Sequence, residues 1–238
     1  MWVDIAGDPG AVAAFYPALF GWRVERGVCH LGDRAIAGIR PGRQRGWVPS
    51  LPVDDLADAA ARLVRAGGRL GADGLVTDPF GAVFGLAEQD DGAYEPGAPV
   101  WVEHRGRDPK LTRRFYQDAF GYLCQHAGPA GYVTFQARTG GLAIGGLGQA
   151  TLGQATRDQA TRGQGKWITY FSVADTDDAA ETVLALGGRV KTAPADSDFG
   201  RVATVADNQG VAFVLVSAVR SGPSLLNQTD KPIVTICG

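Results

Sequence analysis

The sequence contains few of the residues that usually carry redox or metal chemistry. Its 238 residues include three cysteines, three histidines and one methionine. Cys29, Cys124 and Cys237 are an odd number without a Cys-x-x-Cys spacing, which disfavours a disulfide framework and a thiolate metal site. We therefore interpret the three as reduced thiols that pack as small apolar side chains.

The sequence also lacks an excess of charge and a long apolar run. It has 23 basic and 25 acidic residues, so there is no basic surplus to neutralise phosphates, and nucleic acid is not an expected partner. No apolar stretch approaches the roughly 20 residues that span a bilayer, and the first residues show neither the basic nor the apolar region of a signal peptide. These absences predict a cytoplasmic protein that does not bind membranes.

What the sequence does contain is an internal repeat. Three segments of the first half align to three segments of the second half in the same order. They are 8–22 with 108–122, 47–70 with 167–190, and 78–86 with 207–215. Two copies of one module are the simplest account of this pattern. It predicts a first domain at 1–95, a second domain at 100–219 and a C-terminal tail at 220–238.

Each copy has the pattern of a strand-helix-strand-strand-strand unit that is doubled within itself. An Asp-Pro pair starts the first helix of each copy, because aspartate caps a helix and proline suits its first position. Gly21 or Gly121 ends that helix, since glycine adopts the left-handed conformation at little cost. A second helix begins near Asp54 or Asp175 and stops at a Gly-Gly pair. Strands with helices segregated in this order indicate an α+β fold.

The motifs D-P-x(5)-F-Y-x(3)-F-G-W/Y and D-x-x-G-x-x-F-x-L occur in both copies. With them the sequence resembles the vicinal oxygen chelate superfamily, which includes glyoxalase I, bleomycin-resistance proteins and extradiol dioxygenases. It is most similar to the glyoxalase-like hydroxylase group of actinobacteria, many of which belong to antibiotic biosynthesis. The resemblance covers residues 1–219. It implies two tandem domains, each made of paired βαβββ modules that form a curved mixed sheet with outer helices.

The superfamily places metal ligands at three points of a domain: the start of the first strand, the strand that enters the second helix, and the final strand. In this sequence the points are Trp101, Ile168 and Val214 in the second copy and Trp2, Val48 and Gly85 in the first. None of these side chains is a ligand for a divalent metal. We therefore expect neither a metal nor another cofactor, and neither glyoxalase nor ring-cleaving dioxygenase activity.

A curved sheet without metal ligands is expected to bind an aromatic or polycyclic small molecule on its inner face. Strand alternation places the candidate residues on that face: Trp101, Glu103, Arg105, Tyr132, Thr134, Gln136, Ile168, Tyr170, Ser172 and Val214, with Trp2 and Asp4 in the first copy. The pattern Trp-x-acid recurs in both copies, and burial beside Trp101 should raise the pKa of Glu103.

Two segments depart from the repeat. Residues 147–166 repeat Q-A-T at intervals of five and contain few apolar residues, which predicts a flexible insert, with an ordered lid as the alternative. The first copy lacks a counterpart of residues 198–204. Its inner face should therefore be less complete than that of the second copy.

Two functions are consistent with this sequence. In the first, the protein binds a hydrophobic or aromatic small molecule, such as an antibiotic intermediate or a drug, as a monomer or homodimer. In the second, it is a metal-independent biosynthetic enzyme of the isomerase, cyclase or hydroxylation-assisting kind, in which Glu103, Tyr170 or His104 moves a proton. Binding is the favoured hypothesis, because the sequence shows no activated nucleophile, cofactor loop or metal set.

Overall fold

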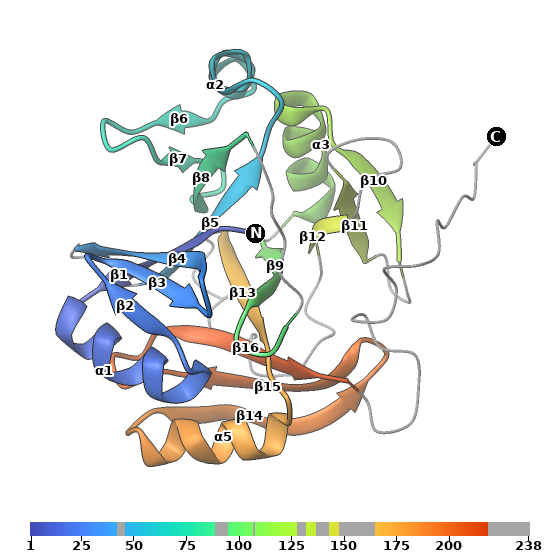
Figure 1. Cartoon of the computed structure of the whole chain (residues 1–238). Helices are drawn as coiled ribbons and strands as arrows, with labels where there is room; N and C mark the ends of the chain where they lie inside the picture. Colours follow the sequence, from blue (N-terminus) through green and yellow to red (C-terminus); the bar gives the residue numbers. More distant parts are fainter. Residues whose placement is uncertain are drawn as a thin grey trace.

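A computed structural model of the chain describes residues 1–41, 46–88, 95–106, 108–127, 132–136, 143–147 and 165–218. They form two eight-stranded mixed sheets with four helices (Figure 1). Most of the predicted insert, residues 148–164, lies outside the described residues, as do Cys237 and the predicted tail at 220–238. None of the helices in these described ranges is long and apolar enough to cross a membrane.

The first sheet has the strand order β2-β3-β4-β1-β5-β8-β7-β6. Its strands are β1 (Val3–Gly7), β2 (Arg23–Glu25), β3 (Val28–Leu31), β4 (Arg34–Pro41), β5 (Gly46–Pro52), β6 (Arg69–Leu70), β7 (Val76–Thr77) and β8 (Val83–Ala87). Helix α1 (Pro9–Phe20) follows β1, and helix α2 (Leu56–Arg65) follows β5. The first sheet is therefore two βαβββ modules that meet where β1 and β5 pair antiparallel.

The second sheet repeats this topology in the order β10-β11-β12-β9-β13-β16-β15-β14. Its strands are β9 (Pro99–Arg105), β10 (Leu123–His126), β11 (Val133–Gln136), β12 (Ala143–Leu147), β13 (Lys166–Ser172), β14 (Arg189–Ser197), β15 (Gly200–Ala206) and β16 (Ala212–Ser217). Helix α3 (Pro109–Phe120) follows β9, and helix α5 (Thr176–Ala185) follows β13. The predicted α+β fold of paired βαβββ modules is confirmed.

The two sheets differ in the length of their strands at one edge. Strands β6 and β7 of the first sheet have two residues each, whereas β14 and β15 of the second have nine and seven.

The residues predicted to begin and end the first helix of each copy do so in the structure. Asp8 accepts a hydrogen bond from the backbone N–H of Ala11, and Asp108 caps α3 in the same way. Gly21 and Gly121 end these helices with φ angles of 72° and 69°, the left-handed region in which a side chain is strained. The second helix of each copy also begins at an aspartate cap. In the first copy the cap is Asp55, one residue after the expected Asp54, and in the second copy it is Asp175, as expected.

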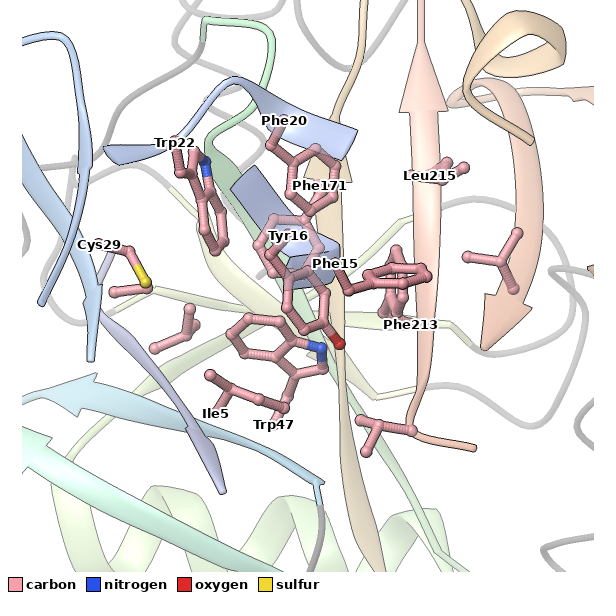
Figure 2. Close-up of a cluster of buried hydrophobic side chains, with 14 of the residues drawn as sticks. Ile5, Phe15, Tyr16, Phe20, Trp22, Cys29, Trp47, Phe171, Phe213 and Leu215 are labelled. Carbon is pink, nitrogen blue, oxygen red and sulfur yellow. The ribbon is translucent and has the colours of Figure 1, made fainter. Parts of the chain in front are cut away.

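The hydrophobic cores join modules from different copies. One core combines α1 and β1 of the first copy with β13, α5, β15 and β16 of the second, and Figure 2 shows Tyr16, Trp22 and Trp47 packed beside Phe171 and Phe213. The other core combines the α2 module with the α3 module, and these two helices lie side by side (Figure 1). Each core thus contains residues of both copies, and neither belongs to one copy alone.

Two buried hydrogen bonds join the copies reciprocally. Tyr16 of α1 donates its hydroxyl proton to Oδ2 of Asp207 at 2.9 Å, and Tyr116 of α3 donates to Oδ2 of Asp78 at 3.0 Å. Each tyrosine belongs to an FY motif and each aspartate to a D-x-x-G motif of the other copy. The second oxygen of each aspartate accepts two backbone N–H groups of its own turn. The two repeated motifs therefore bind each other across the copies.

We predict that removing these hydroxyls destabilises the whole chain unequally. Tyr16→Phe leaves a buried carboxylate oxygen of Asp207 without its donor and should lower the free energy of unfolding by about 1–3 kcal/mol. Tyr116→Phe should cost less, because Nε2 of His104 also lies 2.9 Å from the same oxygen of Asp78. Urea denaturation of the two variants measures both values. An equal or larger loss in Tyr116→Phe would contradict this account.

Candidate functional site

The candidate site lies on the face of the second sheet that its helices do not cover, which we call the helix-free face. Along β13, Phe171 points into a core together with Val173, whereas Ile168 and Tyr170 belong to a separate cluster. That cluster also contains Val214 and Val216 of β16, with Trp101 of β9 packed against it. The helix-free face therefore has an apolar floor built from its three central strands.

A buried polar network crosses this floor. Glu103 of β9 accepts a hydrogen bond from the Tyr170 hydroxyl at 2.5 Å and forms an ion pair with Nε of Arg105 at 2.5 Å. Alternation along β9 places Glu103 and Arg105 on the same face, and the three side chains are at most 6% exposed. The predicted residues Trp101, Glu103, Arg105 and Tyr170 are thus brought together.

Burial changes the acid-base properties of this network. It raises the pKa of Glu103 above its ordinary value, and the positive charge of Arg105 opposes the rise. Burial also raises the pKa of Tyr170, and the neighbouring Glu103 carboxylate adds to that effect. Tyr170 is therefore a hydrogen-bond donor over the physiological pH range, and Glu103 takes up a proton more readily than an exposed glutamate does.

The sheet curves so strongly that side chains next to strands near its opposite edges meet. The ring of Tyr132, next to β11, lies 5.7 Å from the ring of Phe199 in the turn between β14 and β15. In a flat sheet β11 and β15 would be roughly 24 Å apart, because neighbouring strands are about 4.8 Å apart. Tyr132 also accepts a hydrogen bond from Nε1 of Trp101 at 3.1 Å. The helix-free face is therefore enclosed from the side by aromatic rings.

Glycines of the strands β4 and β12 make room for the Trp-x-acid pattern in both copies. Gly146 pairs with Glu103, and a Cβ atom there would collide with the Tyr132 side chain. Gly38 pairs with Asp4, and a Cβ atom there would collide with the Asp4 carboxylate and crowd Trp2. The two faces are thus built on the same plan.

The helix-free face of the first sheet is more open. Asp4 accepts a hydrogen bond from Nε1 of Trp2 at 3.1 Å and pairs with Arg40 of β4 at 2.9 Å, but the Arg40 side chain is 39% exposed. Repeat alignment places Ser50 and Gly85 where the second copy has Tyr170 and Val214. The first copy therefore has smaller side chains at the positions where Tyr170 and Val214 form the apolar floor of the second.

The remaining predicted residues are distributed as follows. Thr134 lies in the same ladder row as Gly146 and Glu103, so its side chain shares their face. Ser172 is buried on the helix-free face and pairs with Val216. A register shift beside Gln136 interrupts the alternation of β11, and this half-buried side chain is not aligned with the others.

His104 is not part of this group, contrary to the hypothesis that it moves a proton there. It is fully buried on the opposite face of β9. There the centroid of its ring lies 5.3 Å from that of Trp167 and 5.7 Å from that of Tyr116. Its Nε2 contacts Asp78. The physical reason is strand alternation: if Glu103 faces the network, its neighbour must face the core.

The described cysteines are poor nucleophiles. Burial raises the pKa of the Cys29 and Cys124 thiols to about 11, so both are protonated at neutral pH.

The donor set of the helix-free face does not fit a metal centre. Trp101 pairs with Tyr170, and Tyr170 pairs with Val214. The middle of the three expected ligand positions is therefore occupied by Tyr170 and not by Ile168. Glu103 is the carboxylate of this region, and it is already bonded to Arg105 and Tyr170. Within the described residues, no group of three His, Cys, Asp or Glu side chains is placed to hold an ion.

Sequence reasoning missed several parts of this site. Phe199 was overlooked because its contact with Tyr132 depends on sheet curvature, which alternation does not report. Val216 was missed although it stands two residues after Val214 on the same strand, so its position was available from alternation. Gly146 was missed because its role depends on its cross-strand neighbour Glu103.

Comparisons with known proteins agree with the fold. Residues 101–216 match the family model of the glyoxalase-like domain. A Mycobacterium tuberculosis protein named as a glyoxylase, CFP32, is 29% identical over 246 aligned residues, covering 89% of this chain and 92% of that protein. The anthracycline biosynthesis protein DnrV of Streptomyces peucetius is 25% identical and covers 94% of each chain.

Among solved structures, homoprotocatechuate 2,3-dioxygenase from Arthrobacter globiformis superposes with a TM-score of 0.61 at 13% identity. The match covers 94% of this chain and 82% of the dioxygenase. At this identity the likeness establishes the fold and not the activity.

We predict that Arg105 stabilises the fold mainly by balancing the buried charge of Glu103. Arg105→Met leaves the Glu103 carboxylate in an apolar environment without its cation and should cost about 3–5 kcal/mol of unfolding free energy at pH 7. The double variant Arg105→Met with Glu103→Gln removes both charges and should recover at least half of that loss. Urea denaturation of both variants decides the point, and equal stabilities would contradict it.

Proposed function

Because the chain has the vicinal oxygen chelate fold in both halves and a glyoxalase-like domain at residues 101–216, we propose that it binds a polycyclic aromatic small molecule on its second helix-free face. One observation carries the proposal: a buried Glu103–Arg105–Tyr170 network stands within an apolar floor beside Trp101. Apolar walls with a few fixed polar groups are typical of small-molecule sites.

The relatives support the class of ligand. DnrV and DauV are named for anthracycline biosynthesis, and anthracyclines are fused-ring aromatic compounds that carry phenol and quinone oxygens. Trp101 offers a ring for stacking. Arg105 offers donors for such oxygens, and the Glu103 carboxylate keeps lone pairs beyond those that accept from Tyr170 and Arg105. An antibiotic intermediate or drug of this kind therefore suits the chemistry of the face, and its recognition requires no metal.

This proposal predicts measurable binding of a simple fused-ring compound. Isothermal titration calorimetry with 2,6-dihydroxyanthraquinone should show a complex whose affinity is unchanged by EDTA. Trp101→Ala should weaken it at least about tenfold, the loss expected for a central aromatic contact. Trp2→Ala, the equivalent change on the first sheet, is the matched control and should leave the affinity unchanged.

Two results would refute this proposal. One is the absence of binding to the wild-type protein. The other is an equal loss of affinity in the Trp101 and Trp2 variants, since that would separate binding from the second face.

A second candidate function is metal-independent acid-base catalysis on such a ligand, as in an isomerase or cyclase. The specific observation in its favour is the raised pKa of Glu103 next to the Tyr170 hydroxyl. Glu103 would accept a proton from a carbon acid of the substrate, and the Arg105 guanidinium would stabilise the developing oxyanion.

Glu103→Gln distinguishes the two functions. The amide keeps hydrogen-bonding capacity toward Tyr170 but does not act as a base. Under the binding hypothesis the amide oxygen still accepts a hydrogen bond but carries no charge, so the affinity for 2,6-dihydroxyanthraquinone should fall by no more than about tenfold. Under the catalytic hypothesis, turnover of a biosynthetic intermediate followed by mass spectrometry should fall at least about a hundredfold. Calorimetry and turnover are compared at a temperature at which circular dichroism shows both proteins folded.

A further inference from the structure

Ser172, the last residue of β13, presents a buried hydroxyl to the helix-free face. Its neighbours Phe171 and Val173 both point into a core, so Ser172 points the other way, like Ile168 and Tyr170. The residue is 1% exposed, and its Oγ has no hydrogen-bond partner within the described residues.

The backbone of Ser172 does not explain this hydroxyl. Its N–H donates to the carbonyl of Ala98, and its carbonyl accepts from the N–H of Gly97. Nearby buried hydroxyls do find partners: Thr176 and Ser217 bond each other at 2.8 Å, and Thr176 also donates to a backbone carbonyl. A buried hydroxyl without a partner is costly, which makes Ser172 a candidate for bonding to a group from outside the chain.

The distance between Ser172 and Glu103 indicates the length of a ligand that would contact both residues. Glu103 pairs with Ile168, and Ser172 stands four residues further along the same strand. At about 3.3 Å per residue the two polar points are roughly 13 Å apart, which corresponds to about three fused aromatic rings with an oxygen at each end. Between them lie the Tyr170 ring and Val214, and Val216 lies level with Ser172. The helix-free face is thus polar at both ends and apolar in the middle.

We propose that the Ser172 hydroxyl hydrogen-bonds to an oxygen at one end of a linear fused-ring ligand whose other end contacts Glu103 and Arg105. The inference rests on the proposed function and deepens it, because it specifies ring number and oxygen placement. A ligand with oxygen at only one end would use the charged network, since hydrogen bonds to charged groups are the stronger ones.

The test pairs one side chain with one ligand hydroxyl. Isothermal titration calorimetry compares 2,6-dihydroxyanthraquinone, which has a hydroxyl at each end, with 2-hydroxyanthraquinone, which has one. The wild-type protein should bind the dihydroxy compound about five- to tenfold more tightly, the value of one added hydrogen bond. In Ser172→Ala the two compounds should bind with equal affinity, and the affinity for 2-hydroxyanthraquinone should be that of the wild type.

Thr169→Val is the matched control. Thr169 lies on the same strand and also has a buried hydroxyl without a described partner, but it alternates to the core side of the sheet. This variant should keep the wild-type preference for the dihydroxy compound.

Three outcomes overturn the proposal. If Ser172→Ala retains the full preference, the ligand does not reach Ser172, although the proposed function stands. If Ser172→Ala and Thr169→Val lose the preference alike, the effect is structural and Ser172 is not a contact. If the wild-type protein binds neither compound, the proposed function fails and this inference fails with it.

Discussion

The architecture depends on the two reciprocal hydrogen bonds between Tyr16 and Asp207 and between Tyr116 and Asp78. Each bond joins a helix of one copy to a turn of the other, so the repeated motifs are complementary parts of one contact. Because each tyrosine hydroxyl must reach a buried carboxylate, α1 is held against the second sheet and α3 against the first. The copies consequently share their cores, and a change at either bond acts on both halves.

This arrangement determines which face of each sheet the helices cover. The helices and the tyrosine-aspartate bonds occupy one face of each sheet, which leaves the opposite faces free of helices. On the second sheet that face holds an ion pair among apolar side chains. Buried ion pairs add little stability compared with well-packed apolar residues. The stability of the fold alone therefore does not account for the Glu103–Arg105 pair.

The sequence predicted the fold well because its signals are local and occur twice. The Asp-Pro caps, the terminal glycines and the alternation that unites Trp101, Glu103 and Arg105 all follow from residues a few positions apart. Contacts that depend on tertiary geometry could not be predicted from the sequence. A repeat alignment shows that Tyr16 and Tyr116 are equivalent, but it does not show that each bonds the other copy's aspartate. The meeting of Tyr132 and Phe199 requires the curvature of the whole sheet.

The two helix-free faces show how one plan yields faces that bury their polar groups to different degrees. Both have a Trp-x-acid pattern over a strand glycine and an arginine that pairs with the acid. In the first copy the arginine, Arg40, comes from a neighbouring strand and is 39% exposed, whereas Arg105 comes from the same strand as Glu103 and is 6% exposed. Charges in a dry environment interact more strongly than charges in water. The second face therefore holds its polar groups in fixed positions, and fixed donors and acceptors discriminate among ligands better than mobile ones.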